Sequence, residues 1–381
     1  MLRKNSLYLS ILFLGWAFLL PAKVVAGPDG EEVPPGEAEA ISQVRDMIQS
    51  SVRDGFKANN HAYRDAHRKH HGCVAAKFEI LPGISPDLAQ GVFATPHTYD
   101  SWVRFSNGSG EDQDDHDGDG RGMAVKLLGV TGGNRVLTAA GEEKNTQDFL
   151  MINHPVFFVR NALDYIGFQK ASAGGKAKVL WWVATHIFHE GKIALDIQKA
   201  GKGMTNPLNS RYWSMVPSKM GAYQMKFSAE PCEVKPFPSP SDSKDRLREN
   251  LEASMANADA CFLFKIQLRT KPDAMPIEDP TIDWSESDAP FVPVAKITIP
   301  RQKPSTGEFC ETLSYTPWNS LAETRPLGGI QRARKEIYIA VSTLRHELNK
   351  QKREEPAVME REVASAAKAV LSGSTPAKEK K

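Results

Sequence analysis

Three residues near the carboxy terminus have types and spacing that could bind a metal ion. Arg334, Tyr338 and Arg345 lie at positions i, i+4 and i+11 of a segment with good helix propensity. At about 100° per residue, their side chains fall within about 40° of one another on the predicted helix. A cationic neighbour favours the ionised form of a phenol, so this stripe predicts a tyrosinate at Tyr338. In proteins, tyrosinate is an axial ligand of haem iron.

The same stripe has a simpler interpretation. A helix can carry two arginines on a solvated face while the ring of Tyr338 packs at the edge of the core and its hydroxyl stays in water. The spacing of these residues alone does not distinguish a metal ligand from such a surface, so the choice depends on the rest of the chain.

A second set of polar residues lies upstream, next to predicted strands. Arg64 and His67 form an R-x-x-H motif before one strand, Arg104 and Ser106 belong to V-R-F-S in a second, and Asn153 follows a third. An imidazole, whose ordinary pKa is near neutrality, can both accept and return a proton. A carboxamide can position a ligand and donate to developing negative charge. These residue types are therefore candidates for proton transfer at a bound ligand.

Five motifs, taken in order, resemble those of the haem catalase family: R-x-x-H, V-R-F-S, R-G-M-A-V-K at 121–126, N-x-P-V-F-F-x-R and R-x-x-x-Y. They extend from Arg64 to Arg345. The late segments Y-T-P-W at 315–318 and R-P-L-G-G-I at 325–330 are similar to those of shorter catalase-related haem proteins. The resemblance implies an α+β fold, an antiparallel β-barrel of the catalase type with flanking helices, lacking the carboxy-terminal domain of full-length catalases.

The resemblance also implies a cofactor, one non-covalent haem b, and the residues that hold it. Tyr338 matches the axial ligand of the iron, and Arg334 matches the arginine that keeps this tyrosine ionised. Arg64, Arg104 and Arg345 match arginines that meet the haem propionates. Guanidinium groups would offset the cost of burying two carboxylates.

On the opposite side of the haem, the resemblance implies that His67 is the distal histidine. Ser106 then hydrogen-bonds this histidine, and Asn153 is the distal asparagine. The turn after His67 is one residue longer than the usual catalase turn. His70 or His71 could instead be aligned as the distal residue, although that alignment loses the R-x-x-H spacing.

The function implied is that of an exported haem peroxidase or catalase. It would reduce or dismutate hydrogen peroxide or a lipid or other organic hydroperoxide, with an electron donor that the sequence does not identify. One alternative is a fatty-acid hydroperoxide isomerase of the allene oxide synthase type, for which the apolar Trp181-Trp182 region leaves room. Another is a haem-binding protein without turnover. The set of His67, Ser106 and Asn153 favours an enzyme, because carriage alone needs no proton relay.

Composition and the amino terminus limit the partners and the location. The 381 residues include 48 basic and 46 acidic side chains, and a net charge of +2 does not suit binding to duplex nucleic acid. Arg3 and Lys4 precede an apolar run that is too short for a stable membrane anchor, which predicts a cleaved signal peptide at 1–26. We therefore expect a periplasmic or secreted protein. The oligomeric state, including a homodimer, stays open.

The hydrophobic pattern predicts the elements that must position these residues. After a linker at 27–37, the haem-binding domain is expected at 38–350 and a charged, disordered tail at 351–381. Helical spacing predicts helices at 38–66, at 161–200 with a break at Gly174-Gly175, and at 328–350. Alternating or apolar runs predict strands at 73–80, 100–106, 122–130, 146–152, 221–228, 260–270 and 292–300.

Three weaker signals have structural interpretations. Asp115, Asp117 and Asp119 match the first half of a calcium loop, but Lys126 stands where the loop needs a glutamate, so we expect a solvated turn. The histidines at 186 and 189 lack a nearby carboxylate and are expected in the core or at its rim. The four cysteines could form two disulfides in any of three connectivities.

Overall fold

The computed structural model describes residues 25–26, 28–139, 142–235 and 243–356. Residues 1–24 of the predicted signal peptide and residues 357–381 of the predicted tail lie outside the described residues.

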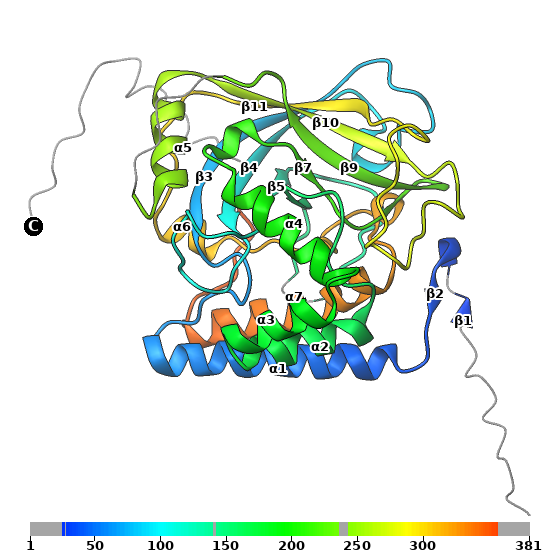
Figure 1. Ribbon diagram of the computed structural model, residues 1–381. Helices are drawn as coiled ribbons and strands as arrows, with labels where there is room; N and C mark the ends of the chain where they lie inside the picture. The colour runs from blue at the N-terminus through cyan, green and yellow to red at the C-terminus, as the bar shows by residue number, and fades with distance from the viewer. Residues whose placement is uncertain (1–24, 27, 140–141, 236–242, 357–381) are drawn as a thin grey trace, which may run out of the picture.

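Eight antiparallel strands close into a barrel in the part of the chain that the structure describes (Figure 1). Their order is β10-β11-β3-β4-β5-β6-β7-β9, and β9 pairs with β10 to close the ring, while β8 extends from β9. This confirms the predicted α+β fold with an antiparallel barrel. The strands are β3 (His70–Ile80), β4 (Thr98–Asn107), β5 (Arg121–Leu128), β6 (Thr146–Ile152), β7 (Tyr212–Trp213), β8 (Ser218–Met220), β9 (Tyr223–Pro231), β10 (Ala260–Leu268) and β11 (Val292–Ile299).

The interior of the barrel is filled by side chains. Alternate residues of each strand point inward, and four phenylalanines meet at the centre of this core. The rings of Phe149 and Phe264 have their centroids 4.9 Å apart, and those of Phe78 and Phe264 lie 5.1 Å apart in an edge-on arrangement. Because the barrel is a packed core, a ligand must bind outside it.

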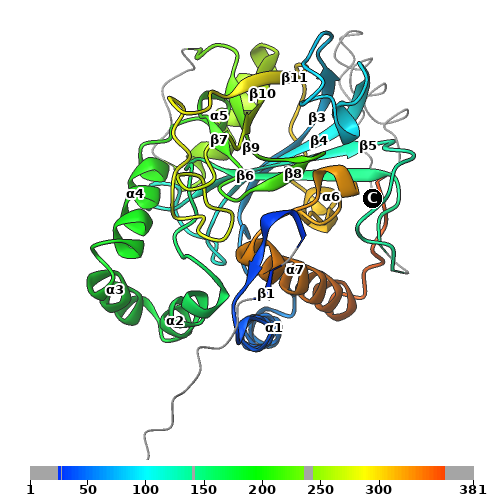
Figure 2. The same cartoon turned by 90° about the vertical axis from the view of Figure 1, so that its right-hand side faces the viewer.

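Helices α1, α2, α3 and α7 form a layer against one side of the barrel, whereas α5 and α6 lie beside β3 (Figures 1 and 2). Apolar residues at helical spacing on α1, Ile41, Val44 and Ile48, pack against Ala333 and Ile337 of α7. The helices are α1 (Glu37–Asn59), α2 (Ala162–Ala173), α3 (Lys176–Thr185), α4 (Glu190–Lys202), α5 (Arg246–Asn257), α6 (Glu308–Thr312) and α7 (Gly329–Leu348), with 3₁₀ turns at 28–30, 91–93, 207–209 and 322–324.

The structure corrects several predicted boundaries. The amino-terminal helix ends at Asn59 rather than near residue 66, and the residues after it form an irregular loop. The segment at 161–200 breaks twice, at Gly174-Gly175 as predicted and again before α4. Two helices, α5 and α6, were not predicted. Leu247, Leu251 and Met255 of α5 recur every four residues, which is the signal that could have identified it.

The segment before α1, predicted as a linker, packs against α7. Its short strand β2 (Glu32–Val33) pairs with β1 (Val25–Ala26). Glu37 accepts two hydrogen bonds from Arg332, at 2.6 and 2.8 Å, and Glu31 is 2.9 Å from the same guanidinium. Both carboxylates are buried. The partners lie about 295 positions apart in the sequence, so local composition did not show this contact.

Candidate active site

A cavity of about 810 Å³ lies between the outer wall of the barrel and the helical layer. Its walls come from α1, α2 and α7, from the loop after α1, and from β4, β5 and β6. Its volume falls within the range of roughly 300–1,000 Å³ that is usual for ligand pockets. His67, Ser106, Arg334 and Tyr338 all line it, so the structure brings these four predicted residues together.

One wall of the cavity carries Tyr338. Arg334 lies one turn earlier on α7, and its Nη2 donates to Tyr338 Oη at 3.2 Å. Gln331 accepts from Arg334 Nη1, also at 3.2 Å, and steadies the guanidinium. Helix α7 can begin at Gly329 because Gly328, with φ of 89°, has no side chain; a Cβ there would lie 2.5 Å from the carbonyl oxygen of Ile277. The predicted contact between a guanidinium and the phenol is therefore present.

His67 lies in the loop after α1, with a φ of 58°. Its backbone nitrogen donates to the Gly108 carbonyl at 2.9 Å, and its own carbonyl accepts from Arg104 Nη2 at 2.8 Å. These two hydrogen bonds stabilise a backbone conformation that residues other than glycine rarely adopt. The imidazole Nδ1 lies 3.1 Å from Ser106 Oγ, the partner that the sequence predicted.

Gly122 on β5 makes room for this pair. A Cβ at this position would lie 2.6 Å from His67 Nδ1 and 2.8 Å from Ser106 Oγ, closer than side chains approach. Sequence reasoning used this glycine only as part of a motif and missed its role. Its place beside Arg121, within R-G-M-A-V-K, was the available signal.

The electrostatic environment keeps His67 neutral. Burial, together with the positive charges of Arg104 and Arg334, lowers the pKa of His67 to about 4. The imidazole is therefore uncharged near neutral pH and can accept a proton. Since Nδ1 faces Ser106, Nε2 is the nitrogen that can exchange a proton with a ligand.

Three guanidinium groups, those of Arg64, Arg104 and Arg345, line the cavity, and the carboxylate of Glu311 pairs with two of them; we call these four residues the arginine cluster. Arg64 Nη1 is 2.7 Å from Glu311 Oε2, and Arg345 Nη1 is 3.4 Å from Glu311 Oε1. Arg345 thus turns toward α6, so only Arg334 of the two stripe arginines bonds to Tyr338. Sequence reasoning missed Glu311, because it lies in a short helix without a motif.

The arginine cluster carries excess positive charge. Burial and the neighbouring Arg64 lower the pKa of Arg104 and of Arg345 to about 9. Burial opposes the ionisation of Glu311, but Arg64, Arg345 and Arg104 outweigh it and lower the pKa of this carboxyl. Among the described residues of the arginine cluster, the three guanidinium groups therefore have one carboxylate, that of Glu311, as their counter-charge.

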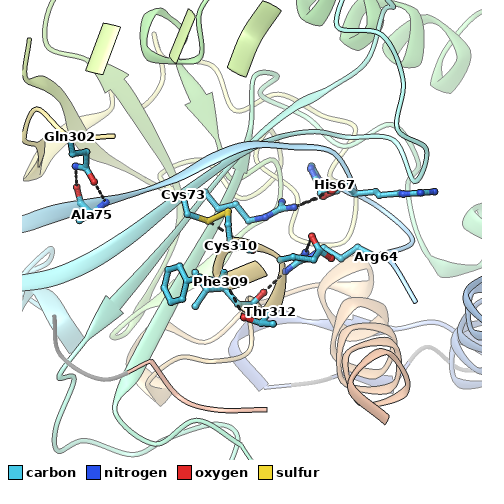
Figure 3. The surroundings of a disulfide bond; sticks show 12 residues. Arg64, His67, Cys73, Ala75, Gln302, Phe309, Cys310 and Thr312 are labelled. Atoms are coloured by element: carbon cyan, nitrogen blue, oxygen red, sulfur yellow. Dashed lines mark hydrogen bonds and ion pairs between the residues drawn. A yellow bond between two sulfur atoms is a disulfide. The ribbon is translucent and has the colours of Figure 1, made fainter. Parts of the chain in front are cut away.

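A disulfide fixes α6 beside the arginine cluster (Figure 3). Cys73 of β3 bonds to Cys310, next to Glu311, and Figure 3 shows Arg64 and His67 on one side of the bond. The second disulfide joins Cys232 and Cys261. The structure thereby resolves the connectivity that the sequence left open.

Asn153 is not brought to the cavity. Its Oδ1 accepts from the backbone nitrogen of Arg121 at 2.7 Å, and its backbone nitrogen donates back to the Arg121 carbonyl at 3.0 Å. Ile152, the last residue of β6, lines the cavity instead. The hydrogen bond to Arg121 holds the Asn153 amide, which is not among the described residues of the cavity lining. This amide fixes the strand beside Gly122.

The alternative distal residues do not line the cavity either. His71 is buried, with Nδ1 3.9 Å from Asp115 Oδ2. His70 lies on β3 and is likewise absent from the described residues of the cavity wall. The placement therefore favours His67 over both.

Two of the three aspartates that match half a calcium loop, Asp115 and Asp119, are bonded to protein groups. Lys69 Nζ lies 2.9 Å from Asp115 Oδ1, and Asp119 accepts two backbone hydrogen bonds at 2.7 Å. In the described part of the chain, no group of three or more His, Cys, Asp or Glu side chains could hold a metal ion. His186 stacks on Trp182 and His189 bonds to Thr281, consistent with structural roles.

The fold of the chain is catalase-like. Three solved structures are similar to it: a fungal catalase (TM-score 0.59, 15% identity), a bacterial catalase (0.58, 17%) and catalase A from Saccharomyces cerevisiae (0.59, 17%). They cover 81%, 88% and 81% of this chain, which spans 67%, 66% and 69% of theirs. No protein-family profile and no curated protein sequence matches the chain.

Proposed function

We propose that the chain is an exported haem-dependent peroxidase or catalase that acts on hydrogen peroxide or an organic hydroperoxide. The observation that carries this proposal is a single cavity with Tyr338 and Arg334 on one wall, and with His67 and Ser106 also in its lining. The catalase-like fold supports an oxidoreductase that uses peroxide.

The residues present fit a haem. Tyr338, bonded to Arg334, would be the ligand of the iron, and the arginine cluster would hold the two propionates. That cluster has an excess of two positive charges, and Nε of Arg104 is buried without a hydrogen-bond partner. Two propionates would supply the missing negative charge. Apolar side chains such as Phe168 and Ile330 would contact the porphyrin faces.

When bound, the haem supplies the redox chemistry of its iron. Ser106 orients the imidazole of His67 through Nδ1, and His67 moves a proton from one peroxide oxygen to the other through Nε2. Arg334 donates a hydrogen bond to Tyr338 Oη and orients the phenol. The arginine cluster binds the carboxylates and fixes the orientation of the ring system. Asn153 acts as a positioning residue through Arg121, rather than by contact with peroxide.

The test is reconstitution of the chain with haem. We expect an absorption spectrum of a tyrosinate complex, together with oxygen evolution from hydrogen peroxide or peroxidation of a dye. Tyr338→Phe should weaken haem binding and shift the spectrum, whereas Tyr165→Phe, which alters another tyrosine of the same cavity, should do neither. His67→Ala should keep haem but lose turnover. An unchanged spectrum in Tyr338→Phe would refute the ligand assignment.

A second candidate function is isomerisation of a fatty-acid hydroperoxide. It is favoured by the apolar Ile152, which lines the cavity while Asn153 points away, since such a wall suits an apolar peroxide. The same reconstituted protein would then consume a lipid hydroperoxide without a reductant. Loss of all three activities in the haem-loaded protein would leave haem binding without turnover.

A further inference from the structure

Large apolar side chains are exposed on α3 and on the turn that follows it. Leu180 is 69% exposed, Trp181 72% and Phe188 98%, with Ile187 beside them at 39%. Figure 2 shows α3 at the outer edge of the molecule, away from the barrel. Exposed apolar residues that gather in this way usually mark an interaction site.

Helix α3 is apolar on both of its sides. Trp182 and Val183 are buried in the helical layer, where the Trp182 ring lies 5.2 Å from that of Phe168. Leu180 and Trp181 face away from this contact. Apolar side chains on the outer side of a helix whose inner side is already packed are suited to contact with a partner.

Lysines flank the exposed side. With Lys176 set at 0° and about 100° per residue, Leu180 and Trp181 lie at about 40° and 140°, and Lys178 lies at about 200°. Both lysines are exposed, and among the described residues neither forms an ion pair. An apolar strip bordered by lysines is typical of helices that lie in the headgroup region of a bilayer.

The net charge of the segment from α2 to α4 distinguishes between two possible partners, a lipid surface and a second copy of the chain. A symmetric dimer would place this face against itself and would bring lysines close to lysines. An anionic surface would instead neutralise them. From α2 to α4 the chain has six lysines, at 170, 176, 178, 192, 199 and 202, and three carboxylates, at 164, 190 and 196.

We propose that Leu180, Trp181, Ile187 and Phe188, with Lys176 and Lys178, form a face that docks peripherally on an anionic phospholipid surface. We call it the α3 face. The apolar side chains enter the boundary between headgroups and acyl chains, and the lysines contact lipid phosphates. In the described part of the chain, no helix is long and apolar enough to cross a bilayer.

The α3 face adjoins the cavity through α2. Phe168, Gln169, Ser172 and Ala173 of α2 line the cavity, and α3 begins three residues after Ala173. Docking would therefore bring the cavity wall close to the acyl chains, where lipid hydroperoxides form. This consequence rests on the proposed function, whereas the docking itself does not need haem.

The test is binding of the full chain to vesicles, with and without haem. We expect binding to vesicles of phosphatidylcholine with phosphatidylglycerol, little binding to phosphatidylcholine alone, and release by salt. Trp181→Ser with Phe188→Ser should weaken binding at least tenfold. Lys176→Gln and Lys178→Gln should each weaken it about fivefold. Val234→Ser, at an apolar site exposed to 71%, is the matched control and should bind normally.

A local probe excludes binding through other parts of the chain. The described cysteines are all in disulfides, so a dye on Ala184→Cys reports from α3 and the same dye on Val234→Cys reports from a distant loop. Only the first should shift to the blue with anionic vesicles. The proposal would be overturned if the Trp181→Ser/Phe188→Ser double variant bound anionic vesicles as tightly as the native chain. It would also be overturned if the dye at position 184 showed no blue shift. A dimer of the native chain that this double variant converts to a monomer would likewise overturn it. Failure of haem reconstitution would leave docking intact.

Discussion

Two groups of buried charges in this molecule have an excess of opposite sign: in the wall of the barrel one ammonium faces two carboxylates, and at the cavity three guanidinium groups face one carboxylate. In the wall of the barrel, Lys126 is fully buried and forms ion pairs with Glu143 and with Asp148, the latter at 2.7 Å. Asn319 donates to Glu143 at 3.0 Å, and Thr146 donates to it at 2.5 Å. Burial opposes the charge on Lys126, but the two carboxylates outweigh it and raise the pKa of the ammonium.

The arginine cluster at the cavity is arranged in the opposite way. Three guanidinium groups share Glu311, and burial leaves Arg104 and Arg345 with pKa values of about 9. Buried charges that have partners within the protein stabilise the fold. Buried charges that the protein leaves without a counter-charge indicate a binding position for a ligand of opposite sign. The comparison therefore predicts opposite results when one charge is removed from each group.

The largest effect is expected from Lys126→Met. Without the ammonium, Glu143 and Asp148 remain buried and unpaired, which should lower the free energy of unfolding by about 3–5 kcal/mol. Urea denaturation followed by circular dichroism measures this. Combining Lys126→Met with Glu143→Gln and Asp148→Asn should recover most of the loss. A single variant as stable as the native chain would show that the barrel-wall group does not hold the fold.

Arg104→Met should separate ligand binding from stability. The haem-free chain loses the hydrogen bonds from Arg104 to the His67 and Arg68 carbonyls but also loses an uncompensated buried charge, so its stability should change by less than about 1 kcal/mol. Haem affinity should fall about 10- to 100-fold, because a propionate loses a charged donor. Haem titration followed by absorbance measures this. Arg301→Met, at an exposed site, is the control. If Arg104→Met were strongly destabilised but bound haem with native affinity, the arginine cluster would stabilise the fold rather than bind a ligand.

Glu311→Gln should increase the charge imbalance of the arginine cluster. Arg64 and Arg345 lose their charged acceptor, so the haem-free chain should lose about 1–2 kcal/mol of stability. Haem carboxylates should then compensate, and addition of haem should raise the melting temperature more in the variant than in the native chain. Equal shifts in the two proteins would argue against a carboxylate ligand in this cluster. Glu308→Gln on the same short helix is the matched control.

Local patterns explain which parts of this arrangement were predictable. Alternation along each strand predicted most of the barrel, because side chains of a strand point alternately inward and outward. Arg334 and Tyr338 were predictable as a pair because they lie one helical turn apart. The R-x-x-H motif located His67, although its backbone conformation and its contact with Gly122 depend on strands that lie far along the chain.

Contacts between distant segments, and the direction of single side chains, were not predictable in the same way. Glu311 joins Arg64 from a position almost 250 residues away, through a five-residue helix that a disulfide fixes. Asn153 directly follows the last residue of β6, where a shift of one residue changes the side that a side chain faces. The motif located this residue correctly in the sequence, but the structure directs its amide to Arg121.

The last effect is expected from His70, a histidine beside the arginine cluster, and it appears only as the pH falls. Burial and Arg104 lower the pKa of His70 to about 4 in the folded chain, below the ordinary value of 6.5. The unfolded chain therefore takes up a proton first as the pH falls. The stabilisation that neutral His70 provides is present above about pH 6.5 and is lost progressively down to about pH 4. Urea denaturation across this range should show a shallower decline for His70→Gln than for the native chain.

Asp65, whose pKa burial raises to about 6, changes stability in the opposite direction but is common to both proteins, so their difference isolates the histidine. Identical pH profiles would mean that burial and the neighbouring guanidinium groups do not lower the pKa of His70 in the folded chain.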